Sequence, residues 1–461
     1  MNDRATHGLG AELGRTLRLA GPIIASQLGQ VGMNTADTIQ VGPLGAEALA
    51  ASGVGSSIHV VALFTIGGIV IGMGPLVSQA FGAGSLEECR RVARQGFWLA
   101  LMLALPVTLL MLIGEPLALL FGQQPGIART AGDYMATLAP GVPAVVLFLA
   151  MRQYLEGMGH AGPPMVVSLG GLALNVLLNH LLIWGWGPIP AMGVVGSGYA
   201  TSIVRWCMVS ALIVYVLAHR EFDPLRGAPP KGWRLDRARL FRIARIGAPI
   251  GLQYGLEIGL FAYAALMMGW FGAVQIAAHQ VTINIAATTF MVALGTSMAG
   301  SIRVGQTIGA GQPVRTRHAI LSTYILAVGF MGLCALAFVL APAWLIGLYT
   351  TDPDILAMGQ RLLMVAAAFQ IFDGGQVAGI CVLRGAGDTQ VPMVIAAIGY
   401  WGVGLASALV LGFRTELGPL GIWIGLAAGL AAVAIALAFR TRSAIWRAPP
   451  SSLVEQTELG G

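Results

Sequence analysis

The chain has 461 residues, of which 56% are hydrophobic and only 10% are charged, and its formal net charge is +6. About one quarter of the residues of a soluble protein are charged, so this composition excludes a water-soluble globular protein. The basic residues fall in separate loops and do not form the single patch that nucleic-acid binding requires. We therefore expect a membrane protein with no nucleic-acid partner.

The amino terminus, "MNDRATHGLGAELGRTLRLAG", begins with polar residues. It lacks the short apolar region and small-residue cleavage site of a signal peptide. We expect the first span to be retained and to direct insertion.

Apolar runs of about 20 residues, long enough to cross the hydrocarbon core, recur along the chain. Turn sequences such as "VGPLG", "FGQQPG" and "TTDPD" separate them. We predict twelve transmembrane helices, at residues 15–41, 47–72, 93–114, 130–152, 164–186, 194–218, 241–270, 275–303, 319–341, 355–383, 391–412 and 418–440.

Arginine and lysine alternate between the two sides of the predicted bundle. They are concentrated after spans 2, 6, 8 and 12, and the loops on the other side are nearly free of them. Because cytoplasmic loops carry an excess of basic residues, both termini and the long central loop are predicted to be cytoplasmic. We expect a multi-pass protein of the inner (plasma) membrane.

The second half of the sequence repeats the first in an almost ungapped register. We call the shift from Val77 to Val304 the repeat offset. At this offset "VSQAFGAG" (77–84) aligns with "VGQTIGAG" (304–311), and "LGAEALAA" aligns with "FGAVQIAA". Six spans per copy is an even number, so both copies enter from the same face, as in a parallel repeat. We predict two six-helix lobes, residues 1–218 and 241–440, with a cytoplasmic linker (219–240) and tail (441–461).

Three acids lie inside predicted spans: Asp37, Glu257 and Asp373. Each charged side chain costs about 2.5–3.5 kcal/mol near the bilayer centre, and such residues are functional candidates by default. The competing interpretation is a structural ion pair with a membrane arginine such as Arg205 or Arg361. At the repeat offset, none of the three acids meets another acid, which favours a separate function in each lobe.

Two pairs of amides share a helix face with spacing i, i+4: Asn175 with Asn179, and Gln280 with Asn284. Amide oxygens combined with a carboxylate and a hydroxyl suit a small cation or a shared proton. The alternative is hydrogen bonding between helices. Gln280 and Asn284 are candidates for lining a cavity.

Enzyme and cofactor motifs are not found. The sequence has no P-loop, HExxH, GxSxG or dinucleotide fingerprint, so no cofactor is expected and any pumping must draw on an ion gradient. Cys89, Cys207, Cys334 and Cys381 are scattered singly, which predicts neither a metal site nor a disulfide framework. We expect a protein that is not an enzyme and acts as a monomer.

Four segments together resemble the multidrug and toxic compound extrusion (MATE) family, in its bacterial NorM-like branch. They are "AAHQVTINIAATTFMVALGTSMAGSIRVGQTIGAG" (277–311), "VLRGAGDTQVPM" (382–393), "DTIQVGPLGAEALAA" and "LNVLLNHLLIWG". The resemblance implies a V-shaped bundle that exports organic cations and drugs in exchange for sodium or protons.

The resemblance also implies site residues. The amino-lobe site that couples transport to a cation would be Asp37, Asn175, Asn179 and Thr201, and the carboxy-lobe site for cation or substrate would be Glu257 and Asp373. Either set could hold Na⁺. Phe369 stands where we expect a tyrosine, one turn before Asp373, so the carboxy-lobe shell lacks that hydroxyl.

The function predicted is secondary active multidrug efflux. The nearest alternative is a flippase for lipid-linked oligosaccharides or lipids, which would line its cavity with Arg and Lys to hold an anionic headgroup. An intramembrane enzyme would need a catalytic constellation that the sequence does not show. A non-transporting receptor would not need a duplicated lobe with two ion sites.

Overall fold

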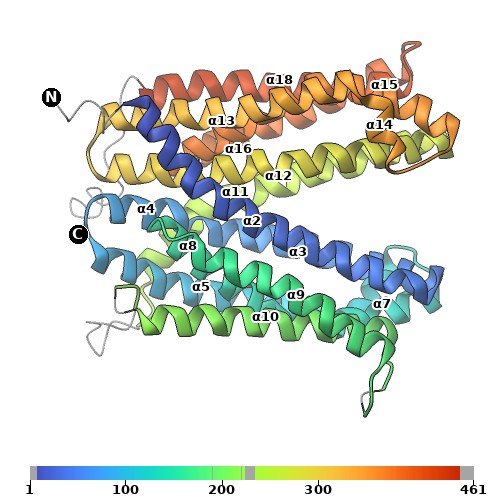
Figure 1. Cartoon of the computed structure of the whole chain (residues 1–461), viewed down its shortest axis with the longest axis horizontal. Helices are drawn as coiled ribbons and strands as arrows, with labels where there is room; N and C mark the ends of the chain where they lie inside the picture. The colour runs from blue at the N-terminus through green and yellow to red at the C-terminus, as the bar shows by residue number, and fades with distance from the viewer. Residues whose placement is uncertain (1–7, 189, 220, 224–233, 447–461) are drawn as a thin grey trace. The chain divides into compact units, whose positions relative to one another are not determined.

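The computed structural model describes residues 8–188, 190–219, 221–223 and 234–446, and these residues are almost entirely helical, with no strand among them (Figure 1). The predicted all-α fold is therefore confirmed. Residues 220 and 224–233 of the predicted linker (219–240) and residues 447–461 of the predicted tail (441–461) lie outside the described residues.

The helices follow the predicted spans in chain order. The amino-terminal copy contains α2 (Leu9–Val41), α3 (Ala46–Ile71), α4 (Met73–Gly82), α5 (Leu86–Leu112), α6 (Gly114–Leu120), α7 (Pro125–Leu138), α8 (Gly141–Gly157), α9 (Gly162–Trp184) and α10 (Gly193–Ala218). The carboxy-terminal copy contains α11 (Arg237–Trp270), α12 (Ala273–Gly309), α13 (Pro313–Leu340), α14 (Pro342–Gly347), α15 (Pro353–Gly385), α16 (Gln390–Ala397), η2 (Ile398–Leu405), α17 (Ala406–Phe413) and α18 (Pro419–Thr441).

Within the described residues, ten helices are long and apolar enough to cross a membrane, and one bent pair raises the number to eleven. Helix α2 covers the first predicted span but is not among them, since polar residues such as Arg18, Gln27 and Gln30 lower its hydropathy. The chain is a multi-pass membrane protein.

The structure divides two of the predicted spans. Residues 130–152 form parts of α7 and α8, which are bent by 49° relative to each other, around Pro140, whose nitrogen carries no hydrogen for a helical bond. Residues 391–412 form α16, the π-helix η2 and α17. Such π segments are rare and are found frequently at functional sites.

The backbone repeats at the same offset as the sequence. Gly45 (φ 105°) precedes α3, and its counterpart at the repeat offset, Gly272 (φ 123°), precedes α12. Gly84 and Gly311, which also correspond at this offset, both have positive φ just after the second span of their copies. The predicted internal repeat is therefore confirmed in the backbone conformation.

Contacts divide the chain into two compact units, and the two boundaries between them fall inside helices α2 and α11. Unit 2 is Ala25–Gly251, and unit 1 is Met1–Ile24 with Leu252–Gly461. The first part of α2 belongs to unit 1, where the buried Glu12 forms an ion pair with Arg303 of α12 at 2.6 Å. The lobe boundaries expected from the sequence stay a prediction.

Unit 2 packs closely where α3 meets the first part of α11. A Cβ atom added to Gly68 would lie 2.2 Å from Cα of Gly251, so only glycine allows this approach, as is typical of membrane helix pairs. Helices α9 and α10 lie side by side in this unit (Figure 1). These helices, with the second half of α2, carry the site described next.

Unit 1 has its own core around α15 and α18. Trp423, Phe369, Phe338 and Tyr400 are among its most buried large side chains. Phe369 packs against Trp423 with ring centroids 5.8 Å apart. The core therefore encloses the turn of α15 that carries Asp373.

Candidate functional site

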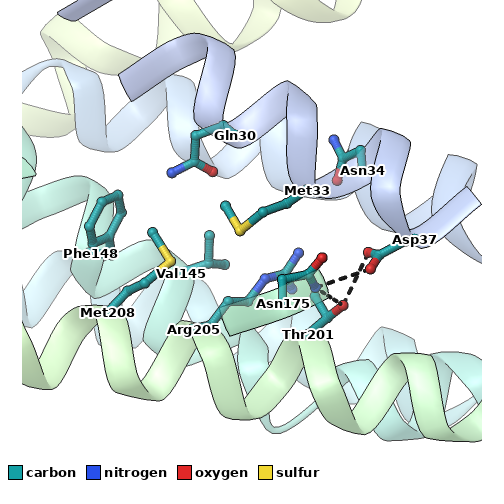
Figure 2. A pocket seen from close by; sticks show the side chains of 10 residues that line it. All are labelled: Gln30, Met33, Asn34, Asp37, Val145, Phe148, Asn175, Thr201, Arg205 and Met208. Atoms are coloured by element: carbon teal, nitrogen blue, oxygen red, sulfur yellow. Dashed lines mark hydrogen bonds between the residues drawn. The ribbon is translucent and has the colours of Figure 1, made fainter. Parts of the chain in front are cut away.

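Three helices of unit 2 bring the four predicted amino-lobe residues together, with Asn175, Asn179 and Thr201 around Asp37. Figure 2 shows Asp37, Asn175 and Thr201 of this set. Asn175 Nδ2 and Asn179 Nδ2, both from α9, donate hydrogen bonds to Asp37 Oδ1 at 3.1 and 2.5 Å. Thr201 Oγ1, from α10, donates to Asp37 Oδ2 at 3.1 Å. The carboxylate at the end of α2 thus accepts three hydrogen bonds from neutral donors.

The orientation of the two asparagine amides determines whether they present hydrogen-bond donors or acceptors to Asp37. The sequence predicts amide oxygens around a cation, whereas the structure turns the nitrogens of Asn175 and Asn179 toward the acid. The buried Oδ1 of Asn179 has no hydrogen-bond partner in the described part of the chain. Rotation of this amide by a half turn would exchange donor for acceptor. The same residues can therefore surround a charged carboxylate or offer oxygens to a cation or an acid proton.

Asp37 lies at the wall of a cavity with a volume of about 30 Å³, enough for about two water molecules. Its lining combines polar and apolar side chains: Gln30, Met33, Asn34, Asp37, Val145, Phe148, Asn175, Thr201, Arg205 and Met208. Sequence reasoning missed several of them, although helical spacing could have found them. Gln30 and Asn34 precede Asp37 by two turns and one turn, and Arg205 follows Thr201 by one turn.

Arg205 does not neutralise Asp37 by a direct ion pair. In the described residues, no ion pair within 4.0 Å joins them. Nη1 of Arg205 instead lies 2.8 Å from Nε2 of His59 on α3. The alternative considered from the sequence was that Asp37 forms a permanent ion pair with a membrane arginine. Arg205 does not form this ion pair in the structure.

The carboxy-lobe candidates lie in unit 1. Asp373, on α15, is 5% exposed and accepts a long hydrogen bond of 3.5 Å from Nε2 of Gln376. Tyr400, on η2, donates to Oε1 of Gln376. Glu257, on α11, is half-buried, and among the described residues no hydrogen bond or ion pair joins it to Asp373. Asp373 is therefore linked to the hydroxyl of Tyr400 through Gln376. This hydroxyl comes from η2, whereas the sequence analysis expected one from position 369, on the same helix as Asp373.

Tyr400 was missed because no sequence signal marks it. It stands in the apolar run "IGYWGVGL", where a tyrosine is most often simply buried. Gln376, by contrast, follows Asp373 by three residues on the same helix and could have been found by its spacing.

The other predicted polar pair, Gln280 and Asn284, is exposed on α12. Asn284 Oδ1 accepts a hydrogen bond from the hydroxyl of Tyr349 at 3.2 Å. Neither residue lines the cavity at Asp37, and their role in a cavity stays a prediction.

Among the described residues no group of three or more His, Cys, Asp or Glu side chains could hold a metal ion. Cys89 and Cys381 are buried, Cys334 is half-buried and Cys207 is exposed, all as free thiols. Any cation at the candidate sites would therefore depend on one or two carboxylates and on neutral oxygens.

The repeated all-α bundle, with a carboxylate in a polar cavity among its helices, is the architecture of a membrane transporter. The MatE family model matches the chain twice, at residues 22–181 and 249–410. The chain therefore belongs to the MATE family, as the sequence resemblance predicted.

Two relatives illustrate the similarity. The chain is 37% identical over 431 residues to the multidrug resistance protein NorM of Burkholderia vietnamiensis, covering 92% of each chain. It is 40% identical over 437 residues to the probable multidrug resistance protein NorM of Pseudomonas putida, covering 93% of this chain and 94% of the relative.

Solved structures share the fold. The Vibrio cholerae MATE transporter VcmN in its bent form superposes with a TM-score of 0.86 at 19% identity, covering 95% of this chain and 99% of that one. The eukaryotic MATE transporter AtDTX14 superposes with a TM-score of 0.85 at 20% identity, covering 95% and 97%.

Proposed function

We propose that this protein is a secondary active multidrug efflux transporter that exports organic cations from the cell in exchange for Na⁺ or H⁺. Family membership and the names of relatives identical at 37% and 40%, multidrug resistance proteins, support this proposal. The multiple spans and the cavity at Asp37 support it independently.

The observation that carries the proposal is the environment of Asp37. Its carboxylate sits in a membrane protein, accepts three hydrogen bonds from neutral groups and faces a cavity. Asp37 is half-buried, and a charge withdrawn from water inside a membrane protein without an ion pair is costly. An acid held in this way can be neutralised by a coupling ion or by a cationic drug, and neither has to break an ion pair with arginine.

The mechanism follows from competition for this charge. If the coupling ion and the drug lower each other's affinity, and the unloaded protein changes conformation slowly, then inward ion flow drives outward drug flow. A membrane potential of about 150 mV supplies roughly 3.5 kcal/mol for each net charge moved. An exchange of one monovalent cation for another moves no net charge and depends on the chemical gradient alone.

We assign the second cation or substrate site to Glu257 and Asp373, with Asp373 held through Gln376. This assignment is supported by the burial of Asp373 and its polar link to Tyr400. No bound cofactor or catalytic step belongs to the mechanism. The protein would act as a monomer in the inner membrane, with both termini in the cytoplasm, as the distribution of arginine and lysine predicts.

A lipid flippase would need an excess of cations to hold an anionic headgroup. The cavity at Asp37 is lined by one arginine and one acid, so it has no such excess. Export of small molecules is the function that this arrangement favours.

Reconstituted protein provides the test. Ethidium efflux is measured in proteoliposomes under separately imposed proton and sodium gradients, for the wild type, Asp37→Asn and the matched control Asp133→Asn, which alters an exposed acid of α7. We expect gradient-driven efflux for the wild type and the control and none for Asp37→Asn. Efflux of Asp37→Asn at the wild-type rate would remove Asp37 from the mechanism, and no response to either gradient would contradict antiport.

A further inference from the structure

The first turn of α2 carries a buried acid, Glu12, on which arginines from three helices of unit 1 converge. Nε of Arg303, on α12, donates to Glu12 Oε1 at 2.7 Å, and Nη1 of Arg15, on α2 itself, donates to Glu12 Oε2 at 3.2 Å. Nη2 of Arg315, on the first turn of α13, lies 3.8 Å from Glu12 Oε2. We call these four residues the arginine cluster. One carboxylate can neutralise only one of its arginines.

Arg315 is the arginine of the cluster that Glu12 holds least closely. Its Nε is buried and has no hydrogen-bond partner among the described residues, and its Nη1 donates to the neutral Oε1 of Gln312 at 2.6 Å. In the described part of the chain, Glu12 is the one acid within 4.0 Å of Arg303 or Arg315. Because a guanidinium binds phosphate and carboxylate groups through parallel hydrogen bonds, the donors of Arg315 suit an anionic ligand.

The corresponding positions of unit 2 carry the opposite charges. At the repeat offset, Glu12 corresponds to Arg239, and Arg315 corresponds to Glu88. Arg239 forms ion pairs with two acids, Glu88 and Asp236. One acid thus faces several bases in unit 1, whereas one base faces two acids in unit 2. A single ion pair would be enough to attach the start of each helix, so helix packing alone does not explain the additional arginines of unit 1.

The cluster is expected at the surface of the membrane. Arg315 belongs to the basic loop after the eighth predicted span, which the sequence predicts to be cytoplasmic. Exposed apolar side chains accompany the arginines: Val314, next to Arg315, is 61% exposed, and Leu17 of α2 is 57% exposed. The cytoplasmic leaflet contains anionic lipids, and basic pockets between transmembrane helices on this side bind their head groups. A soluble anion would need the arginines but not the apolar side chains.

We propose that the arginine cluster binds the phosphate of an anionic phospholipid, with Arg315 donating to the phosphate and the acyl chains against Val314 and Leu17. The phosphate supplies the negative charge that Glu12 alone does not provide. A lipid bound here contacts the starts of both α2 and α13 and stabilises the attachment of α2 to unit 1. The proposal goes beyond the proposed efflux function and does not depend on it.

Two short-chain lipids that differ in net charge test the proposal. Dioctanoyl phosphatidylglycerol is an anion, and dioctanoyl phosphatidylcholine has the same chains and a phosphate but no net charge. Each lipid, and inorganic phosphate at matched ionic strength, is titrated into the purified full-length protein in a neutral detergent, and binding is measured by thermophoresis. The proteins compared are the wild type, Arg315→Gln, Arg315→Lys and the control Arg361→Gln, which removes an exposed arginine of α15.

We expect the wild type to bind phosphatidylglycerol about tenfold more tightly than phosphatidylcholine, as one hydrogen bond to a charged group predicts. Arg315→Gln should lose most of this preference. Arg315→Lys keeps the charge but not the planar fork, so it should retain part of the preference, and it provides the test if the glutamine variant does not fold. Arg361→Gln removes the same charge elsewhere in unit 1 and should keep the full preference.

Equal affinity of the wild type for the two lipids would overturn the proposal, and so would an unchanged preference in both Arg315 variants. Inorganic phosphate that binds as tightly as phosphatidylglycerol would assign the cluster to a soluble anion and overturn the choice of a lipid. Because transport is not measured, a failure of the efflux function would leave these results unchanged.

Discussion

Tyr400, on the π-helix η2, donates its hydroxyl hydrogen to Oε1 of Gln376, and the amide of Gln376 points its nitrogen at Asp373 on the same helix, α15. This link places a hydroxyl behind the acid even though Phe369 occupies the position where a tyrosine was expected. The carboxylate of Asp373 is thus positioned from a helix that follows it in the chain.

We predict that Tyr400→Phe weakens cation binding at Asp373 and lowers the free energy of unfolding by about 1–3 kcal/mol, since the buried Gln376 oxygen would lose its donor. Thermal unfolding in detergent and equilibrium drug binding measure the two effects. Tyr199→Phe, on the exposed face of α10, is the control and should change neither. Full drug affinity in Tyr400→Phe would show that Gln376 does not position the acid.

The hydroxyl of Thr201 provides the second prediction. Thr201→Val keeps the shape of the side chain but removes the donor to Asp37 Oδ2, and a hydrogen bond to a charged group contributes about 1.5–3 kcal/mol. Because the charged carboxylate is then less stable, the coupling ion should leave more slowly and efflux should fall by about tenfold. Thr201→Ser keeps the hydroxyl and should transport at close to the wild-type rate. If serine and valine behave alike, the hydrogen bond has no role in transport.

Sequence alone predicted the fold class and the repeat because both depend on patterns that extend over the whole chain. A long apolar run or a constant offset between the two copies is still recognised when single positions depart from the pattern. The bend at Pro140 and the π-helix at Tyr400 were missed, since each depends on a local backbone choice inside an apolar run. The apolar pattern of a straight span and of a broken span is the same.

The sequence predicted which residues form the amino-lobe site, but it did not predict how their side chains are oriented. Asp37 and the Asn175–Asn179 pair were found because charge in a membrane and i, i+4 spacing are visible in the sequence. The orientation of the amides was not predicted, because an asparagine can present either its nitrogen or its oxygen. The place of Arg205 was also hidden, since its choice of His59 over an acid depends on how α3 packs near α10.

The paired glycines of the repeat give a prediction about stability. Gly45 and Gly272 have φ of 105° and 123° with ψ of 170° and 178°, a region that is open essentially to glycine alone and costs other residues about 1–3 kcal/mol. Gly45→Ala and Gly272→Ala should each destabilise the protein by about this amount, measured by thermal unfolding in detergent. Gly53→Ala, inside α3 with open space around it, should be neutral or stabilising by up to about 1 kcal/mol. Equal effects at all three positions would contradict a requirement for positive φ.

The last prediction concerns a buried ion pair in unit 2. Arg152 and Glu156 are 4% and 1% exposed, their side chains are 2.6 Å apart, and Arg152 also donates to Gln27 of α2. Glu156→Gln would leave the arginine buried without its counter-charge, and removal of one partner of such a pair costs about 3–5 kcal/mol. We expect a large loss of thermal stability for this single variant.

Replacing both Arg152 and Glu156 by methionine should recover most of that stability, because a well-packed apolar pair of similar volume is often as stable as a buried ion pair. Unfolding of the wild type, Arg152→Met, Glu156→Met and the double variant in detergent measures the coupling between the two residues. A double variant as unstable as Glu156→Gln would mean that Arg152 stabilises the unit through Gln27. The contact between α8 and α2, rather than the neutralisation of charge, would then be what holds the second half of α2 in place beside the Asp37 cavity.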